Sequence, residues 1–525
     1  MERSMTRRQF VATGAGLTLA TGVGAAKDRV EGRPGQASTG SAHPPNVLVI
    51  HVDQHRMDCL GAYGNADIQT PNIDALAADG VRFDNSFCPF PVCTPSRYSL
   101  LSGRYVHQHR GWTNHSTLLP GTETFPAILK RAGYKTKAVG KMHFTPTYLD
   151  LGFEEMALSE QNGPGRWDDD YHRQLRAHDL VDYNDLEDQE REFRADARPE
   201  YWEHFGALPS NLPREWHSTT WIGDRAVETL DEWGPSRRLL MAGFIKPHHP
   251  FDPPQEFCDA YNPDALSLLP GWSEACFPHD QALSKGYFPN ADLTEASLRR
   301  VMAYYYASIQ HIDRQVGRMI EVLKRKGLYD DTLIIFTSDH GEYMGYHHMI
   351  LKGNHMYEPL VKVPLIIKYP SGRDRGTASQ ALVSNVDVAP TILSQAGCTP
   401  ADTMHGLDLA RDTEGRDMVF AESRRGRSAM VRTKQYKLLL GHPKQQALFY
   451  DLEKDPVETT NRHDDPAYRD QVEALTKAIT AWRSFDNLPE TYLDENAPII
   501  DQSNVPSRDD DHRETIIAYC RDKMH

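Results

Sequence analysis

The hydrophobic pattern of the chain is dominated by short apolar runs, each of which stops abruptly at polar or charged residues. Such runs occupy residues 46–53, 238–244, 332–337 and 363–368. Runs of this length without polar alternation are typical of strands that are buried on both faces, as in a parallel sheet with helices on either side. The pattern therefore predicts an α/β fold built on a large, mixed but mostly parallel sheet.

A longer segment between these runs has helical periodicity. Over residues 294–326 the apolar residues recur every three or four positions, and the segment ends at Gly327. This spacing predicts an amphipathic helix with the glycine at its C-terminus. Helical patterns that alternate with strands favour a sheet sandwiched by helices.

The pattern changes after about residue 400. Four short strand-like runs separated by turns are followed by a helical pattern near residues 465–484. Short runs of this kind predict a small antiparallel sheet. We expect a main domain over residues 46–400, and a smaller C-terminal antiparallel-sheet subdomain with a polar tail over residues 401–525.

The N-terminus predicts export from the cytoplasm. The pair Arg7-Arg8 precedes a weakly apolar segment that is rich in Gly, Ala and Thr. We interpret residues 1–26 as a twin-arginine signal peptide, although a chance arginine pair in a frayed N-terminus gives the same pattern. Residues 27–45 are rich in Gly, Pro, Ser and charge, which predicts a linker. No run reaches the roughly 18 apolar residues of a transmembrane helix, so we expect a periplasmic or extracellular protein.

The balance of charge narrows the classes of partner. The chain has 58 Lys and Arg residues against 73 Asp and Glu residues. This acidic balance argues against nucleic acid or an anionic membrane surface as the partner. An anionic substrate would then need a local pocket of cations. The candidates for that pocket are Arg97, Lys141, Lys246 and Lys352.

The stretch Cys93-Thr94-Pro95-Ser96-Arg97 carries the first candidate chemistry. Proline suits the first turn of a helix, where its missing N–H group costs nothing, so the stretch predicts a loop that turns into a helix. The free N–H groups and the dipole at a helix N-terminus favour an anion. We expect Cys93 and Arg97 to face one oxyanion-bearing ligand, although a buried structural cysteine beside a surface arginine has the same spacing.

These residues resemble the first signature of the type I sulfatases, the formylglycine-dependent branch of the alkaline-phosphatase-like superfamily. Residues 133–143, GYKTKAVGKMH, are similar to the second signature of that family. The resemblance implies hydrolysis of sulfate esters by an alkaline-phosphatase-like fold. It also implies that a separate formylglycine-generating enzyme or anaerobic maturase oxidises Cys93 to formylglycine, whose hydrate attacks sulfur. Among the six other cysteines, Cys258 with Cys276 is the only disulfide pair that we single out.

Candidate metal ligands follow two of the buried runs. Asp53 and Gln54 stand at the end of the first run, and Asp339 and His340 come just after the run that ends at residue 337. Ligands of open α/β sheets collect at the carboxyl ends of strands, although each aspartate could instead cap a helix. The resemblance implies one divalent cation, and it favours Ca²⁺, while Mg²⁺ and Mn²⁺ suit the same donors. Its ligands would be Asp53, Gln54, Asp339, His340 and the modified Cys93.

The resemblance assigns roles to several basic side chains near the cysteine. Lys141 and Lys352 correspond to lysines that bind the sulfate group, although Lys352 could also be a solvated surface residue. His143 corresponds to a residue that contacts the formylglycine hydrate or the sulfate. Arg97 is expected to orient the hydrate rather than to bind the substrate.

A third element, Lys246-Pro247-His248, follows the run at residues 238–244. By resemblance, His248 is the general acid for the leaving group and Lys246 binds the substrate, with His249 as the alternative acid. Asn114 lies in a loop that resembles a substrate-facing segment, although a turn role fits it equally well. The adjacent histidines at positions 347 and 348 could also approach the pocket.

The substrate is left open by the sequence. Residues 145–235 follow the family pattern least, and we expect a partly helical insertion that covers the pocket. Its aromatic rings could stack on a sugar or simply belong to the core. We expect a sulfated carbohydrate as the substrate, attacked from a chain end, with aryl sulfates or choline sulfate as alternatives.

Two other functions compete with this interpretation. The same superfamily includes hydrolases of phosphonates and of phosphate mono- and diesters, and their fold would be the same. A non-catalytic glycan-binding relative would be expected to lack the cysteine or a metal ligand, and neither is missing from this chain.

Overall fold

The computed structural model describes residues 44–163, 165–281, 288–353, 355–441, 446–484 and 510–524. The predicted signal peptide and nearly all of the predicted linker lie outside these residues. Within them, no helix combines the length and the apolar character that crossing a membrane requires.

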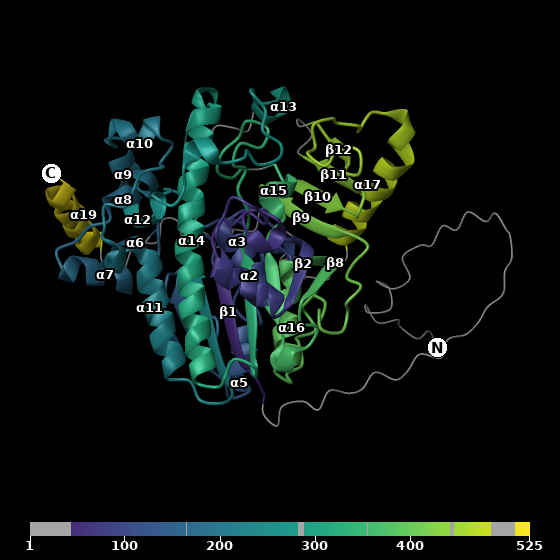
Figure 1. The fold of residues 1–525 in the computed structure, drawn as a ribbon. Coiled ribbons are helices and arrows are strands. Elements are labelled where there is room, and N and C mark those ends of the chain that lie inside the picture. The colour runs from purple at the N-terminus through teal and green to yellow at the C-terminus, as the bar shows by residue number, and fades with distance from the viewer. Residues whose placement is uncertain are drawn as a thin grey trace. The chain divides into compact units, whose positions relative to one another are not determined.

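The centre of the fold is an eight-stranded sheet with the order β4-β3-β5-β1-β6-β7-β2-β8 (Figure 1). Strand β7 is antiparallel to both of its neighbours, and all other pairings are parallel. The prediction of a mixed, mostly parallel sheet is therefore confirmed. The strands are β1 (Asn46–Val52), β2 (Val81–Phe87), β3 (Lys135–Gly140), β4 (Glu155–Leu158), β5 (Arg238–Phe244), β6 (Thr332–Ser338), β7 (Leu365–Lys368) and β8 (Thr377–Ser384).

The side chains of β1 explain why the sheet is covered on both faces. Leu48, Ile50 and Val52 belong to one apolar core, whereas Val47 and Val49 belong to a second core. Successive side chains of a strand point to opposite faces. The run is apolar at every position because each face of the sheet meets a layer of helices.

Helices form the two layers around the sheet (Figure 1). One core contains residues of α2, α11 and α14, and the other contains residues of α3, α5 and α16. The helix that the spacing predicts is α14 (Glu295–Arg325), and the hydroxyl of Thr294 caps it by accepting a hydrogen bond from the backbone N–H of Ser297. The other helices of these layers are α2 (Pro71–Ala78), α3 (Cys93–Ser102), α5 (Phe125–Arg131), α11 (Ser218–Asp231) and α16 (Val388–Gln395).

Short helices make up much of the expected insertion at residues 145–235. Most of its tryptophans are buried or half-buried, and Trp202 is the only large apolar side chain that is exposed among the described residues. The helices of the insertion are α6 (Gly165–Asp168), α7 (Asp170–Ala177), α8 (Tyr183–Gln189), α9 (Arg191–Arg194) and α10 (Pro199–Glu203). Four further short helices lie elsewhere: α4 (Val106–His109), α12 (Gln255–Cys258), α13 (Pro278–Gln281) and α15 (Glu358–Val361).

The C-terminal part contains a second, four-stranded sheet with the order β12-β11-β10-β9, and all of its pairings are antiparallel. Helix α17 (Arg469–Ser484) packs on it through Leu475 and Ile479. The predicted antiparallel sheet and its helix are thus confirmed. The strands are β9 (Val419–Ser423), β10 (Ser428–Arg432), β11 (Tyr436–Leu440) and β12 (Leu448–Asp451).

The last helix, α19 (Asp510–Met524), packs on the insertion rather than on the small sheet. Arg513 lies 5.2 Å over the ring of Trp167 and forms a 2.9 Å ion pair with Glu192. The polar composition of the tail gave no sign of this helix. One apolar cluster joins it to the insertion, made of Trp167, Leu186, Phe193, Ile516, Ile517 and Cys520.

None of the seven cysteines, all of which lie within the described ranges, forms a disulfide bond. The pair Cys258–Cys276 that we single out from the sequence is therefore wrong. The Cys258 sulfur instead lies 3.5 Å from the carbonyl oxygen of Pro253, inside the protein.

Candidate active site at the sheet edge

Position 93 opens helix α3, with Pro95 in the first turn as the sequence predicts. The side-chain oxygen of Asn114 accepts a 3.1 Å hydrogen bond from the backbone N–H of Thr94. The hydroxyl of Thr94 donates a 2.8 Å hydrogen bond to the carbonyl oxygen of His143. The helix N-terminus is thus tied to the two loops that carry Asn114 and His143, and Cys93 is held between them.

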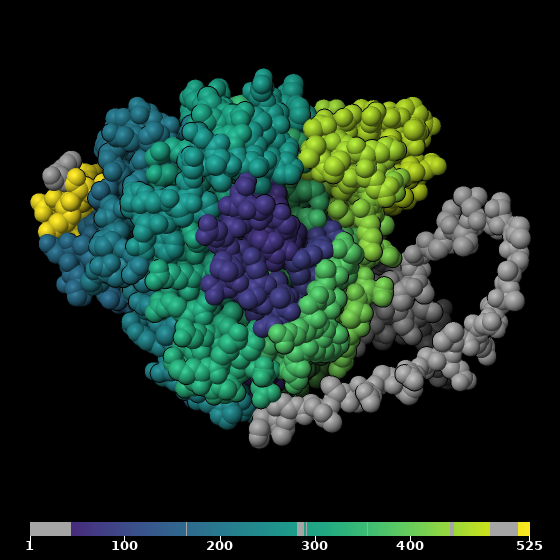
Figure 2. All heavy atoms as spheres, in the orientation of Figure 1, coloured from purple at the N-terminus to yellow at the C-terminus, as the bar shows by residue number. Residues whose placement is uncertain are grey.

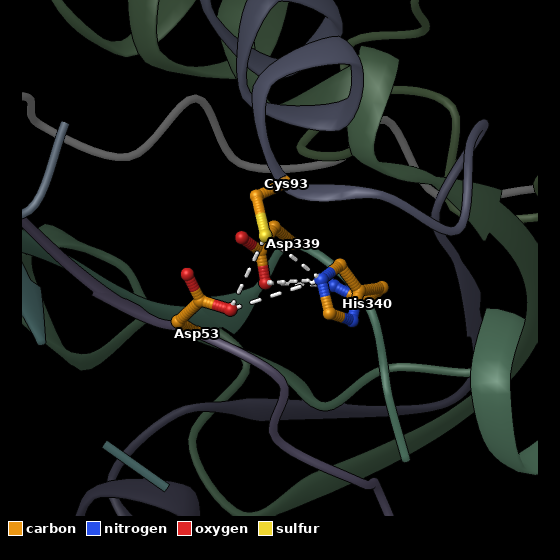
Figure 3. Close-up of side chains that lie close together, drawn as sticks. All are labelled: Asp53, Cys93, Asp339 and His340. Carbon is orange, nitrogen blue, oxygen red and sulfur yellow. Dashed lines mark hydrogen bonds and ion pairs between the residues drawn. The ribbon is translucent and has the colours of Figure 1, made fainter. Parts of the chain in front are cut away.

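The ends of two neighbouring strands bring acidic groups to Cys93. Asp53 follows β1 directly, and Asp339 and His340 follow β6, which pairs with β1 in parallel. One ligand atom from each of these three side chains and the sulfur of Cys93 lie within 4.8 Å of one another, and all four side chains are buried. Figure 3 shows them pointing toward a common centre.

Arg97 bridges the two carboxylates. Its Nε lies 2.9 Å from Oδ2 of Asp339, and its Nη2 lies 3.0 Å from Oδ2 of Asp53. Burial and the neighbouring Asp53 raise the pKa of Asp339, but the guanidinium and His340 hold that pKa below its ordinary value. The fork of Arg97 is occupied by protein carboxylates, so it fixes their geometry rather than contacting a ligand.

The donor set fits a divalent cation. Gln54 has a φ of 61°, and its backbone N–H donates a 3.0 Å hydrogen bond to Oδ1 of Asp339. Its amide nitrogen donates to Glu342, whereas its amide oxygen is buried without a hydrogen-bond partner among the described residues. A buried, unpaired amide oxygen beside two carboxylates is a hard oxygen donor of the kind that Ca²⁺, Mg²⁺ and Mn²⁺ bind.

Two lysines add positive charge around Cys93. Lys141 is fully buried, and its Nζ lies 2.7 Å from Oδ2 of Asp53. Lys352 is half-buried, and its Nζ lies 3.0 Å from the sulfur of Cys93 and 3.3 Å from Nε2 of His340. Burial and the Asp53 carboxylate oppose ionisation of the thiol, but these cations bring the pKa of Cys93 below its ordinary value. The site is therefore built to hold negative charge at position 93.

The two adjacent histidines have different surroundings. Nε2 of His248 lies 2.8 Å from Nζ of Lys352, and its Nδ1 lies 2.7 Å from the carbonyl oxygen of His249. Nδ1 of His249 lies 2.6 Å from Oδ2 of Asp188. Burial, assisted by Lys352, holds the pKa of His248 well below its ordinary value. Of the two imidazoles, that of His248 contacts the lysine beside Cys93.

His143 offers a free nitrogen close to the cluster. Its backbone N–H donates a 2.9 Å hydrogen bond to Glu160, and its Nδ1 is buried without a partner among the described residues. Burial and the nearby charge of Lys141 lower the pKa of His143 to about 3, so its ring is neutral at physiological pH.

The structure places Lys246 away from the cluster. Its Nζ lies 2.5 Å from Oδ1 of Asp252 and donates a 2.9 Å hydrogen bond to the carbonyl oxygen of Pro250. Its ammonium is thus bonded inside the protein, and the expected role of Lys246 in substrate binding stays a prediction. His347 and His348 also lie elsewhere, bonded to the carbonyl oxygens of Val457 and Ser273.

Several polar residues that the sequence analysis missed support the site. Glu342 binds the amide of Gln54, and the Gln161 amide oxygen lies 3.4 Å from Nζ of Lys141. Asp188 holds His249, and Glu160 accepts hydrogen bonds from the backbone of residues 142 and 143. Glu342 could have been found from the sequence, because it lies two residues after His340. The others come from the insertion, where no motif marks them.

Solved structures of similar fold include the phosphonate monoester hydrolase of Agrobacterium radiobacter. It has a TM-score of 0.70 and 25% sequence identity, and the match covers 84% of this chain and 95% of that chain. Together with a metal-fitting cluster at the carboxyl ends of β1 and β6, this fold defines a hydrolase of the alkaline-phosphatase-like class.

Sequence comparisons specify the family. The family model described as "Sulfatase" matches residues 45–398, and the one described as "N-sulphoglucosamine sulphohydrolase, C-terminal" matches residues 345–484. An arylsulfatase of Clostridium perfringens is 31% identical, with 86% of this chain and 96% of the relative covered. An N-acetylglucosamine-6-O-sulfatase of Bacteroides thetaiotaomicron is 27% identical, with 79% and 82% covered. The chain belongs to the sulfatase family, as its two signatures indicate, and is a sulfuric ester hydrolase.

Proposed function

We propose that this sulfatase removes sulfate from carbohydrate esters, with position 93 as the nucleophile after conversion of Cys93 to formylglycine. The observation that carries the proposal is the placement of Cys93. Its sulfur, at a helix N-terminus, lies 3.0 Å from the ammonium of Lys352, 3.2 Å from Nε2 of His340 and 3.6 Å from Oδ1 of Asp53. A group at this point meets cations on one side and metal-fitting donors on the other.

A divalent cation completes the proposed site. Asp53, Asp339 and His340 would hold it together with the amide oxygen of Gln54 and the modified residue 93. We favour Ca²⁺ by resemblance to the family, since hard oxygen donors suit Mg²⁺ as well. When bound, the cation polarises a sulfuryl oxygen and the formylglycine hydrate supplies the nucleophilic oxygen. Arg97 keeps both carboxylates in place for this ligand set.

The remaining side chains handle charge and protons. Lys141 and Lys352 are positioned to offset the negative charge of the sulfate group, and His143 presents an unpaired nitrogen next to them. Fixed cations of this kind need no reorganisation during the reaction. His248, whose Nε2 lies 2.8 Å from the ammonium of Lys352, would take a proton from that ammonium and pass it to the departing alcohol oxygen. Asn114 acts indirectly, by holding the backbone beside Cys93.

Two observations bear on the substrate class. The relative from Bacteroides thetaiotaomicron is named for N-acetylglucosamine 6-O-sulfate, which favours a sulfated sugar, whereas the Clostridium relative is named as an arylsulfatase. The insertion supplies residues such as Asp188 and Gln161 that contact the active-site side chains. We infer a pocket that takes a chain end, and efficient cleavage inside long polymers would contradict this inference.

Export and modification of the cysteine are assigned to separate parts of the chain. We propose that residues 1–26 direct twin-arginine export and that residues 27–45 are a linker. Residues 46–400 would form the catalytic domain, and residues 401–525 the C-terminal subdomain with its tail. A formylglycine-generating or anaerobic maturase would act on Cys93 before folding, because the cysteine is 1% exposed in the folded chain.

One experiment tests the nucleophile. The enzyme is produced with and without a maturase, and the peptide that contains position 93 is analysed by mass spectrometry alongside sulfate release from N-acetylglucosamine 6-sulfate. We expect activity to rise in proportion to the fraction of formylglycine. Full activity in a preparation that retains a thiol at position 93 would refute the proposal.

A phosphonate or phosphate mono- or diester hydrolase is the second candidate, because the Agrobacterium enzyme of similar fold is a phosphonate monoester hydrolase. The two candidates share a fold and differ in substrate. Turnover of a sulfate monoester and of a phosphodiester, measured with one preparation, separates them. A higher kcat/KM for the phosphodiester would favour the second candidate.

A further inference from the structure

A cavity of about 440 Å³ lies outside the proposed active site. It opens between the main sheet and the C-terminal subdomain. In Figure 2 the purple N-terminal part of the main domain and the lime-green C-terminal subdomain flank a recess on the visible face. The residues that line it include Arg56, Arg82, Glu358, Lys362 and Arg432. None of the side chains assigned to the reaction is among them.

The lining carries four cations and three carboxylates. Arg56 pairs with Asp58 at 2.6 Å, and Arg82 pairs with Asp84 at 2.7 Å. The two carboxylates of these pairs are partly exposed. Each of these arginines therefore has its own carboxylate.

The remaining charged residues of the lining have an excess of positive charge. Glu358 is shared between Arg432, at 3.4 Å, and Lys437 behind the wall, at 3.1 Å. Lys362 has no carboxylate at ion-pair distance within the described ranges, and burial lowers its pKa. The Nε of Arg432 is buried without a hydrogen-bond partner there as well. Arg432 thus shares its one carboxylate with Lys437, and Lys362 has none within the described ranges.

The rest of the lining is apolar, and much of it consists of side-chain rings. Two tyrosines and three prolines contribute to the wall, and Tyr63 also lies under the guanidinium of Arg82 at 5.5 Å. Flat apolar faces beside a cationic group suit a ring that carries an anionic substituent. The volume admits a molecule of about the size of a monosaccharide ester, and it lies in the range of small-molecule sites.

We propose that this cavity is a second binding site, for a small organic anion that carries one anionic group on a ring, such as a sugar sulfate. The anionic group would contact the ammonium of Lys362, with the charge of Arg432 also in the lining, and the ring would lie against the tyrosines and prolines. This site does not depend on the chemistry at position 93. It could therefore retain a sulfated sugar close to the enzyme whether or not the reaction proceeds as proposed.

Calorimetric titration of the full chain tests the site. The Cys93→Ala variant removes turnover, and the probes are N-acetylglucosamine 6-sulfate, N-acetylglucosamine and inorganic sulfate. We expect the sugar sulfate to bind about tenfold or more tightly than either of its parts, because charge and ring both contribute. Equal binding of the uncharged sugar would overturn the anion contact, and equal binding of inorganic sulfate would overturn the ring contact.

Lys362→Met in the Cys93→Ala background locates the binding. We expect it to remove one bound sugar sulfate per chain, or to weaken that class about tenfold or more. Lys434→Met is the matched control, because Lys434 is exposed and lies outside the lining. An isotherm that Lys362→Met leaves unchanged would overturn the proposal.

A stability measurement separates binding from a structural role. Lys362→Met removes a buried cation that lacks its own carboxylate, so the melting temperature of the ligand-free protein should stay the same or rise. A fall of several degrees, with the Lys434→Met control unchanged, would assign Lys362 to a structural ion pair and overturn the proposal.

Discussion

The role of His248 can be tested by changing the leaving group. Sulfate transfer from a sugar expels an alcohol oxygen that needs a proton, whereas 4-nitrophenyl sulfate expels a stable phenolate that does not. His248→Asn keeps a donor near the carbonyl oxygen of His249, which now lies 2.7 Å from Nδ1, but removes the Nε2 atom that lies 2.8 Å from Lys352. The variant therefore removes the proton donor with little change in the local hydrogen bonds.

The expected size of the effect follows from the contact with Lys352. General acid catalysis by one side chain contributes on the order of 10²–10⁴ in rate. Lys352 lies 3.0 Å from the sulfur of Cys93 and could still deliver a proton in the variant, so we expect a loss at the lower end of that range. For N-acetylglucosamine 6-sulfate, His248→Asn should lower kcat by about 10²–10³, and for 4-nitrophenyl sulfate by about tenfold or less.

The control is the neighbouring histidine. The imidazole of His249 is bonded to Asp188 at 2.6 Å and stacks on His248 with ring centres 4.2 Å apart. His249→Asn should lower kcat on both substrates to a similar, smaller extent, because it disturbs only the position of His248. An equal loss on both substrates for His248→Asn, or a leaving-group dependence that appears in His249→Asn instead, would refute the assignment.

Three further outcomes are expected. Lys141→Met should lower kcat/KM by on the order of 10²–10³, as for the loss of one fixed charge, and an unchanged value would remove Lys141 from the sulfate site. Burial lowers the pKa of His217 to about 3, so this group disfavours the folded state progressively as the pH falls below about 6.5. Urea unfolding should therefore show wild type losing about 2 kcal/mol relative to His217→Asn between pH 7 and pH 5, and parallel curves would contradict this. Ile516→Asp should detach α19 and speed amide exchange in α8, because it places a charge in the apolar cluster that joins the two helices. Ala518→Asp, at an exposed position, should leave the exchange unchanged, and equal exchange in both variants would contradict the packing.

The framework of the site was predictable because strand ends are predictable. Asp53 and Asp339 each follow an apolar run, and parallel neighbouring strands bring their carboxyl ends to one edge of the sheet. Nothing in the pattern shows which runs are neighbours. The resemblance to a known family supplied that information by placing both aspartates in one ligand set.

The environment of Lys246 could not be predicted in the same way. Lys246 and His248 lie on one short turn, and both were expected in the site. The direction of each side chain depends on its partners. The ammonium of Lys246 forms an ion pair with Asp252, whereas the imidazole of His248 contacts the ammonium of Lys352. A motif fixes which residues are near the strand end but not which way each one points.

The tail and the insertion were the least predictable parts for a related reason. Helix α19 packs on the insertion across more than 300 positions of sequence, with Arg513 bonded to Glu192. Its apolar stripe is short, and its partner surface is assembled from several short helices. Packing between two irregular surfaces leaves little periodicity in either sequence.

Gln54 stands where two adjacent carboxylates would be expected by resemblance, and its surroundings explain how an amide serves there. Its nitrogen donates to Glu342, which fixes the orientation of the amide and leaves the oxygen without a protein partner. A carboxylate at position 54 could not donate to Glu342 and would add a charge beside two buried aspartates. The side chain of Gln54 therefore donates to Glu342 through its nitrogen and offers its oxygen to a cation. The positive charges of Arg97 and Lys141 balance the two aspartates that remain.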